Sequence, residues 1–247
     1  MSEVEGIRRE VEWRKISRLA HFTPLRNLVH IATGHGLLST QYLTEHERSA
    51  FNQQDLERLD GYPDHISCSI EYPNAYYLRR KRLEARGEER IFPDWVCLLI
   101  EPHHLWREST LLCPHNAAGG RGVNVEGGLE CFQAMFADEV VAPQRSWPRG
   151  KQPDCSPTDA QAEVLVHRQI ALGDVRAVVV ETPEQAANTY AVLDQLEAPV
   201  EELPIIVAPG FYAPTPLAVG LSRGLRPVES PWHPPAGDDR GDHESAA

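Results

Sequence analysis

Apolar positions along the chain recur with the periods of short helices. Between the Thr23–Pro24 start signal and Gly34, apolar residues repeat at helical spacing, which predicts a helix capped by Thr23 with Pro24 at its first position. We expect helices in three more segments: the basic stretch after Pro73, residues 129–136, and residues 182–196, the last with Thr182 as its cap.

Strands are predicted by alternation and by short apolar runs. Residues 66–72 alternate apolar and polar, which is typical of a half-buried strand, and Pro73 ends it. Residues 95–100 are continuously apolar and predict a strand buried on both faces. Further short strands are expected over residues 163–166, 175–180 and 205–207. Because strands outnumber helices without alternating with them, the pattern favours an α+β fold around a mainly antiparallel sheet.

Composition indicates one globular domain followed by a polar tail. The chain has 247 residues, 41% hydrophobic and 24% charged, which excludes a disordered or fibrous protein. We assign residues 1–228 to a single domain and expect the acidic segment 229–247 to be disordered. No apolar run is long enough for a membrane span and no signal peptide is evident at the start, so we expect a soluble, cytoplasmic protein without membrane partners.

The net charge of −12 opposes tight, non-specific binding to nucleic acid, so any such contact must be local. Two segments, 78–90 and 143–151, each carry a net charge of +3. Either segment could be an ordinary solvated surface. The second also contains Trp147 between Arg145 and Arg149, an arrangement suited to stacking on the bases of a single strand.

Common cofactor and metal motifs are missing from the sequence. Dinucleotide, phosphate-loop, zincin and α/β-hydrolase signatures do not occur, and the five cysteines form no CxxC pair. His103, His104, Cys113 and His115 are close in sequence, but their spacing matches no standard zinc pattern, so we predict no metal.

One carboxylate is placed where a strand begins. Glu163 follows a polar, proline-containing loop, and period-two alternation puts it on the strand face opposite Ala162, Val164 and Val166. Such a glutamate is either a positioned functional group or an exposed edge residue. His21, just before the first predicted helix, is likewise either functional or structural.

Five segments in order resemble the DarT family of ADP-ribosyltransferases, the toxin components of toxin–antitoxin pairs. The resemblance covers roughly residues 15–212 and rests on these pieces: HFTPLRNLVHIATGHGLLS (21–39), SCSIEYPNAYY (67–77), DWVCLLIEPHHLW (94–106), CPHNAAG (113–119) and TDAQAEVLV (158–166).

The resemblance implies an ADP-ribosyltransferase fold, a split and mostly antiparallel sheet with flanking helices that grips NAD in its cleft. It implies that Glu163 is the catalytic carboxylate. On the NAD side it implies contacts from His21, Thr23, Asn27, Gly34 and Gly36. The loop with Trp147, Arg145 and Arg149 falls where the family recognises its target.

One stretch departs from the thymidine-modifying members. Asn74, in the sequence YPNAYY, stands where those members carry an arginine, and Tyr77 replaces a methionine. The chain therefore looks closer to a YPN-bearing branch, and guanine is expected as an acceptor at least as much as thymine. Tyr72 could stack on nicotinamide or belong to the core. Asn74 could bind NAD, and Asn116 could bind the acceptor, although both also suit turns.

The leading hypothesis is a toxin that transfers ADP-ribose from NAD to guanine or thymine in single-stranded DNA and releases nicotinamide. The resemblance implies a macrodomain antitoxin as its partner. The alternatives are a transferase acting on RNA or protein, and a non-catalytic binding module with a degenerate NAD cleft.

Overall fold

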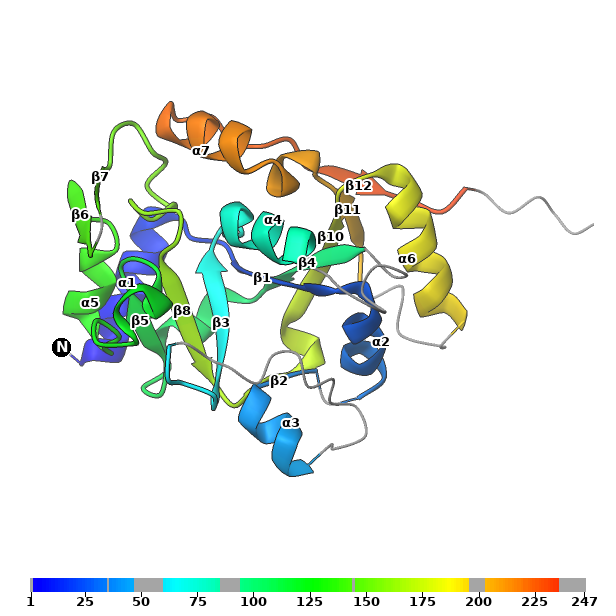
Figure 1. Ribbon diagram of the computed structural model, residues 1–247, viewed down its shortest axis with the longest axis horizontal. Helices are drawn as coiled ribbons and strands as arrows, with labels where there is room; N and C mark the ends of the chain where they lie inside the picture. Colours follow the sequence, from blue (N-terminus) through cyan, green and yellow to red (C-terminus); the bar gives the residue numbers. More distant parts are fainter. Residues whose placement is uncertain are drawn as a thin grey trace, which may run out of the picture.

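A mostly antiparallel sheet of eight strands crosses the molecule in the order β12-β11-β10-β4-β1-β3-β8-β5 (Figure 1). The computed structural model describes residues 2–34, 36–46, 60–84, 94–143, 145–195 and 203–235. The strands of this sheet are β1 (Leu19–Pro24), β3 (His65–Ile70), β4 (Trp95–Ile100), β5 (Leu111–Cys113), β8 (Glu163–His167), β10 (Val175–Val180), β11 (Ile205–Val207) and β12 (Ser230–Trp232). Only β10 and β11 pair in parallel within it.

The sheet is split between β1 and β3. These strands share only two paired positions, Leu19 with Ile70 and Ala20 with Ser69, whereas β1 pairs with β4 along all six of its residues. The strands β3, β8 and β5 therefore form one half of the sheet, joined to the other half at one end of β1. This is the split, mostly antiparallel sheet expected from the sequence.

Helices cover both faces. One face is covered by α1 (Glu3–Arg14), α2 (Leu25–Thr33), α5 (Leu129–Ala134) and α6 (Pro183–Gln195), which share a large apolar cluster with it. The other face is covered by α4 (Ala75–Glu84), η7 (Pro209–Tyr212) and α7 (Pro214–Ser222). Figure 1 shows α4 and α7 above the sheet and α2 below it. The large fully buried side chains Phe132 and Phe211 lie in the two clusters, one on each face.

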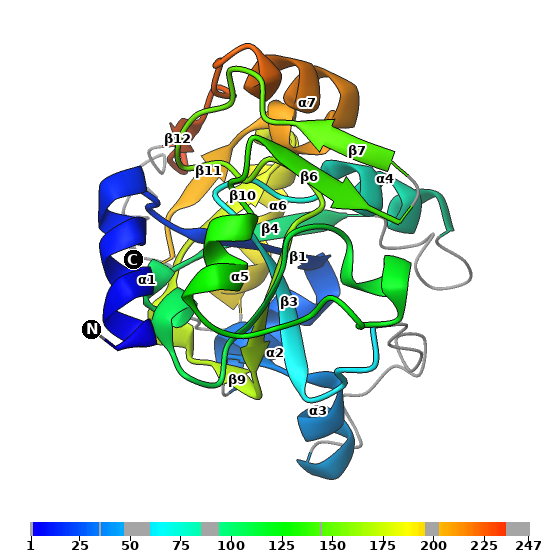
Figure 2. The same ribbon diagram turned by 90° about the vertical axis from the view of Figure 1, so that its left-hand side faces the viewer.

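Smaller elements complete the fold. The pairs β2 (Leu37–Leu38) with β9 (Gln169–Ile170) and β6 (Glu139–Ala142) with β7 (Arg145–Pro148) form two additional ribbons. The remaining elements are α3 (Thr40–His46), η3 (Pro102–Trp106), η4 (Ala117–Gly120) and η5 (Leu172–Asp174). Seen from the side, the β6–β7 hairpin projects beneath α7 (Figure 2).

Most of the predicted elements are confirmed, and the start of the first predicted helix is wrong. Strands form over Trp95–Ile100 and Val175–Val180 as predicted, and Thr182 caps α6 by accepting a hydrogen bond from the Gln185 N–H. Thr23, however, belongs to β1, because it continues the ladder with β4, and the helix starts only at Leu25. The predicted helix end at Leu196 and the basic residues Arg86 and Arg90 lie outside the described residues.

The boundary placed at residue 228 is also wrong. Ser230–Trp232 pair with β11 as the edge strand β12, and Glu229 binds the Arg18 guanidinium through two hydrogen bonds of 2.5 and 2.7 Å. Alternation of apolar residues is too short here to reveal a strand. Residues 236–247 of the predicted tail lie outside the described residues.

Among the described residues, no helix is long and apolar enough to cross a bilayer.

Shortening the chain tests the contribution of β12. A chain that ends at Val228 loses the edge strand and leaves the mostly buried Arg18 without Glu229, so we expect the free energy of unfolding to fall by about 3 kcal/mol. Urea denaturation measures this change. The control is a chain that ends at Pro235 and retains all described residues, and it should unfold like the full chain. Equal midpoints for the chains ending at 228 and 235 would contradict the role assigned to β12.

Candidate active site

The carboxylate of Glu163 is held from two sides at the start of β8. Its Oε2 accepts a hydrogen bond of 2.6 Å from the Ser67 hydroxyl on β3, and its Oε1 accepts one of 3.0 Å from the Ala117 N–H. The side chain is half-buried. Both donors are neutral, and together they orient the carboxylate.

Ser67 also connects Glu163 to His21 across the split in the sheet. Its carbonyl oxygen lies 2.8 Å from the His21 Nδ1. A carbonyl oxygen can only accept, so the His21 Nδ1 carries a proton. One residue of β3 therefore touches both predicted site residues, and they lie on either side of the line where β1 and β3 diverge.

Of the other residues expected at NAD, Thr23 and Asn27 lie at the start of α2, and Gly36 lies in the turn between α2 and β2. Asn27 donates a 3.0 Å hydrogen bond from its side-chain amide to the Thr23 hydroxyl, and Thr23 is buried. Gly36 has a φ of +84°, and a Cβ there would lie 2.3 Å from the Ile170 carbonyl oxygen. Any other residue at this position would push the β2 turn away from β9, so Gly36 has a packing role irrespective of ligand.

Tyr72 and Asn74 are held by the protein itself. Tyr72 is buried in the cluster beneath α4 and α7, with its ring edge-on to Phe211 at 5.8 Å. Asn74 accepts a 3.1 Å hydrogen bond from the Tyr77 N–H and so caps α4. Both of the structural alternatives left open by the sequence, core packing and turn formation, are thus observed.

Asn116 acts on the site through the backbone. Its side-chain oxygen accepts from the Gly119 N–H and caps η4, the short helix whose first residue, Ala117, donates to Glu163. Next to it, burial raises the pKa of the Cys113 thiol to about 12, with a further contribution from the charge of Glu163 and an opposing one from the His115 N–H. The thiol beside Glu163 therefore stays protonated at neutral pH and is no nucleophile.

Trp147 and Arg145 lie together on the hairpin. The Arg145 guanidinium is exposed and stacks 3.9 Å above the Trp147 ring. The indole N–H of Trp147 is buried and has no hydrogen-bond partner among the described residues. A cation and an aromatic ring therefore lie side by side on the hairpin.

Arg149 has a different environment. Its guanidinium donates to the carbonyl oxygens of Ser156 and Pro153 and to the Thr158 hydroxyl, at 3.0–3.2 Å. Those bonds fasten the loop that precedes Glu163. Arg149 therefore positions this loop and is not an exposed side chain.

Two residues of the site were not singled out from the sequence. Ser67 looked like an ordinary polar position of a half-buried strand, and its contact with Glu163 depends on the pairing of β3 with β8. Asp159 is buried in the loop before β8, and burial raises the pKa of its carboxyl group, opposed by the Gln161 N–H and by the charges of Arg145 and His115. In the sequence, the only indication that Asp159 belongs to the site was its position in the loop just before the strand that begins with Glu163.

These features match a known family. The family model for DarT, described as ssDNA thymidine ADP-ribosyltransferase, matches residues 20–213. The chain belongs to the DarT family. No curated protein sequence matches it.

Solved structures show the same fold at low sequence identity. Thermus sp. 2.9 DarT in complex with NAD⁺ is similar with a TM-score of 0.53, 14% identity, 80% of this chain and 98% of that chain covered. The complex of the same protein with ADP-ribosylated ssDNA is similar with a TM-score of 0.52 and 16% identity. The match covers 80% of this chain and 97% of that chain. Thermosipho africanus DarTG in complex with ADP-ribose is similar with a TM-score of 0.54 and 14% identity. The match covers 79% of this chain but 51% of that chain.

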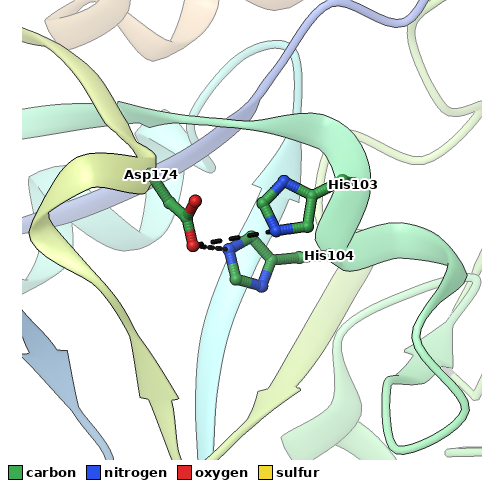
Figure 3. Close-up of side chains that lie close together, drawn as sticks. All are labelled: His103, His104 and Asp174. Atoms are coloured by element: carbon green, nitrogen blue, oxygen red, sulfur yellow. Dashed lines mark hydrogen bonds and ion pairs between the residues drawn. The ribbon is translucent and has the colours of Figure 1, made fainter.

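Of the four residues considered as metal ligands in this DarT chain, His103 and His104 lie together, and the Cys113 sulfur lies 3.8 Å from the His115 Nδ1. His103 and His104 lie at Asp174, where His104 Nε2 is 3.0 Å and His103 Nε2 is 3.7 Å from its Oδ2 (Figure 3). The Arg107 guanidinium lies 2.7 Å from His103 Nε2 and so uses its lone pair. A positive charge at this place opposes a cation, and we assign no metal to the three residues that Figure 3 draws.

Replacing Ser67 tests whether the orientation of the Glu163 carboxylate matters for transfer. Ser67→Ala removes the 2.6 Å hydrogen bond and leaves the chain path intact, so we expect kcat to fall by about 10-fold or more with little change in the KM for NAD. Initial rates of ADP-ribose transfer measure both constants. The control is Ser109→Ala, away from Glu163. A kcat for Ser67→Ala equal to that of Ser109→Ala would show that Glu163 needs no such donor.

The buried His104 should make stability depend on pH. Burial lowers its pKa to about 4, aided by the charges of Arg107 and His103 and opposed by Asp174. An unfolded histidine takes up its proton near pH 6.5, so between about 6.5 and 4 the unfolded chain binds more protons and stability falls as the pH falls. We expect His104→Leu to flatten this part of the pH profile of the urea midpoint. Parallel profiles for both proteins would refute the assignment.

Proposed function

We propose that the chain transfers ADP-ribose from NAD to a base of single-stranded DNA, thymine or guanine, and releases nicotinamide. The observation that carries the proposal is the Glu163 carboxylate, oriented by Ser67 and Ala117 and connected through Ser67 to His21 across the split sheet. Membership of the DarT family, over residues 20–213, supports the reaction class.

Cleavage of the bond between nicotinamide and ribose needs a fixed negative charge and no general acid. When the bond between the ribose C1′ and nicotinamide breaks, its electron pair leaves with nicotinamide, which departs neutral, and positive charge develops on the ribose. Glu163 binds the ribose 2′-hydroxyl and stabilises this charge. The acceptor base then forms the new bond to C1′, and Glu163 takes up the proton that the base loses.

On the NAD side, His21, whose Nδ1 is fixed to Ser67, binds a ribose hydroxyl. Thr23 and Asn27, which bond one another, and Gly36 complete the wall formed by the start of α2 and the β2 turn. Tyr72 and Asn74 are buried at the start of α4, and they form the wall of the NAD site opposite α2.

The acceptor strand is held by the hairpin. Trp147 offers a ring face for stacking, and Arg145 a charge for a phosphate. Asn116 and Arg149 contribute by fixing η4 and the loop before Glu163. The acceptor must be unpaired, because duplex pairing hides the atoms that react.

In this proposal, the choice between thymine and guanine depends on the residues at the start of α4. The family description specifies thymidine, whereas this chain has Asn74 and Tyr77 in the stretch that departs from the thymidine-modifying members. Homopolymer oligonucleotides incubated with NAD and weighed by mass spectrometry identify the modified base.

We assign the enzyme a biological role as a toxin with a macrodomain antitoxin that removes the modification. Support comes from the similar Thermosipho africanus DarTG chain, of which the present chain spans about half the length. Growth arrest on expression of the chain, relieved by co-expression of a macrodomain partner, tests this role.

Neutralising the carboxylate tests the central residue. Glu163→Gln keeps the shape and removes the charge, so we expect transfer to DNA to fall at least about 1000-fold while the protein remains folded. The measurement is transfer of radiolabelled ADP-ribose to single-stranded DNA, with single-stranded RNA and protein as parallel acceptors. The exposed Glu126→Gln is the matched control. Activity in Glu163→Gln equal to that of Glu126→Gln would overturn the mechanism, and transfer to RNA or protein in place of DNA would overturn the acceptor.

A further inference from the structure

Three charged residues meet beside the turn that connects β3 to α4. Arg18, which directly precedes β1, donates hydrogen bonds of 2.5 and 2.7 Å to the Glu229 carboxylate. Its Nε donates to the Glu71 carbonyl oxygen at 3.1 Å and lies 3.6 Å from the Glu71 Oε2. We call Arg18, Glu71 and Glu229 the Arg18 cluster. It joins the start of β1, the end of β3 and the segment before β12.

The backbone at Glu71 is strained, and several contacts hold it in place. Its φ is +63°, a left-handed conformation that costs a residue with a Cβ about 1 kcal/mol or more. Its buried carboxylate accepts from the N–H and the hydroxyl of Ser17, and its N–H donates to the Arg18 carbonyl oxygen at 3.1 Å. Strained backbone that is fixed from several sides is concentrated at functional sites.

The turn that begins at Glu71 carries Tyr72 and Asn74, which we assign to the wall of the NAD site opposite α2. The Tyr72 N–H donates to the Ile70 carbonyl oxygen at 2.8 Å, which closes the turn. The Arg18 guanidinium lies 5.6 Å from the centroid of the Tyr72 ring. Arg18 therefore holds both the backbone before Tyr72 and the ring of Tyr72.

The second carboxylate of the cluster comes from the C-terminal segment. Glu229 directly precedes β12, and Arg226, three residues earlier, donates a 3.5 Å hydrogen bond to the Cys155 sulfur in the loop before β8. The family match covers residues 20–213, so Arg18 and Glu229 both lie outside it. Residues outside the matched region thus fix a turn inside it.

Burial of these charges is a poor source of net stability. Each charged group loses hydration when it is buried, and the attraction within the cluster has to offset that loss. The cluster also contains two carboxylates for one guanidinium. What it supplies is a defined geometry, because Arg18 contacts Glu229, the Glu71 carbonyl oxygen and the Tyr72 ring at the same time.

We propose that Arg18 and Glu229 are positioning residues for NAD, which hold the turn with Tyr72 and Asn74 in the conformation that binds it. This inference rests on the proposed function and adds to it the residues that fix one wall of the NAD site. Glu163 has its own donors, Ser67 and Ala117. Loosening the cluster therefore weakens NAD binding and leaves the carboxylate oriented.

Removing the charges of the cluster one at a time tests the proposal. Glu229→Gln keeps the shape of the side chain, Arg18→Met removes the guanidinium, and a third protein carries both substitutions. The matched control is Glu10→Gln, since the Arg14–Glu10 pair on α1 is 12% and 23% exposed and the Arg18–Glu229 pair 14% and 24%. Initial rates at varied NAD and at varied single-stranded DNA, NAD hydrolysis without DNA, and urea midpoints are measured for each.

The expected result is a change in KM for NAD with little change in kcat. We expect Glu229→Gln to raise the KM for NAD about 10-fold, in transfer and in hydrolysis, with kcat within about 2-fold of the wild type and the KM for DNA unchanged. The double variant should match Arg18→Met, because Glu229 acts through Arg18. A purely structural loss would lower the active fraction, and with it kcat, without moving this KM.

Other results have distinct meanings. A KM for NAD in Glu229→Gln equal to that in Glu10→Gln would overturn the inference, whatever the urea midpoints. Independent, additive effects of the two substitutions would overturn the link through Arg18. If Arg18→Met does not fold, the comparison of Glu229→Gln with Glu10→Gln decides alone. A wild-type protein that consumes no NAD would refute the proposed function itself and this inference with it.

Discussion

The site depends on holding one carboxylate in a fixed direction. Glu163 accepts one hydrogen bond from a hydroxyl of β3 and one from a backbone N–H of η4. Each donor fixes one oxygen, so the side chain has a defined direction.

This arrangement requires several distant segments to meet. The Ser67 hydroxyl is in place only because β3 and β8 pair in one register, with Ser67 opposite Leu165. The Ala117 N–H is in place because Asn116 caps η4. Arg149 fastens the loop in front of Glu163 through backbone carbonyls. Polar residues that a sequence would suggest as ligand contacts thus serve to build the backbone that holds the charge.

Elements from the end of the chain fold back onto one face and one edge of the sheet. After the parallel strand β11, the chain forms α7 over the face with α4 and then returns as β12 at the edge of the sheet. Glu229 closes this return by binding Arg18, which precedes β1. The C-terminal segment therefore stabilises the edge of the sheet through β12 and packs against the face that carries α4 through α7.

Local patterns in the sequence determined much of this protein. The apolar run 95–100, the alternation at 66–70 and the cap at Thr182 predicted elements that depend mainly on nearest neighbours. Family motifs pointed to Glu163 and His21. Tertiary structure decided what depends on pairing across the sheet: that Thr23 extends β1, that Ser67 links Glu163 to His21, and that a strand forms after residue 229. These contacts join residues far apart in the chain, and their energy comes from hydrogen bonds and burial that exist only once the sheet has formed.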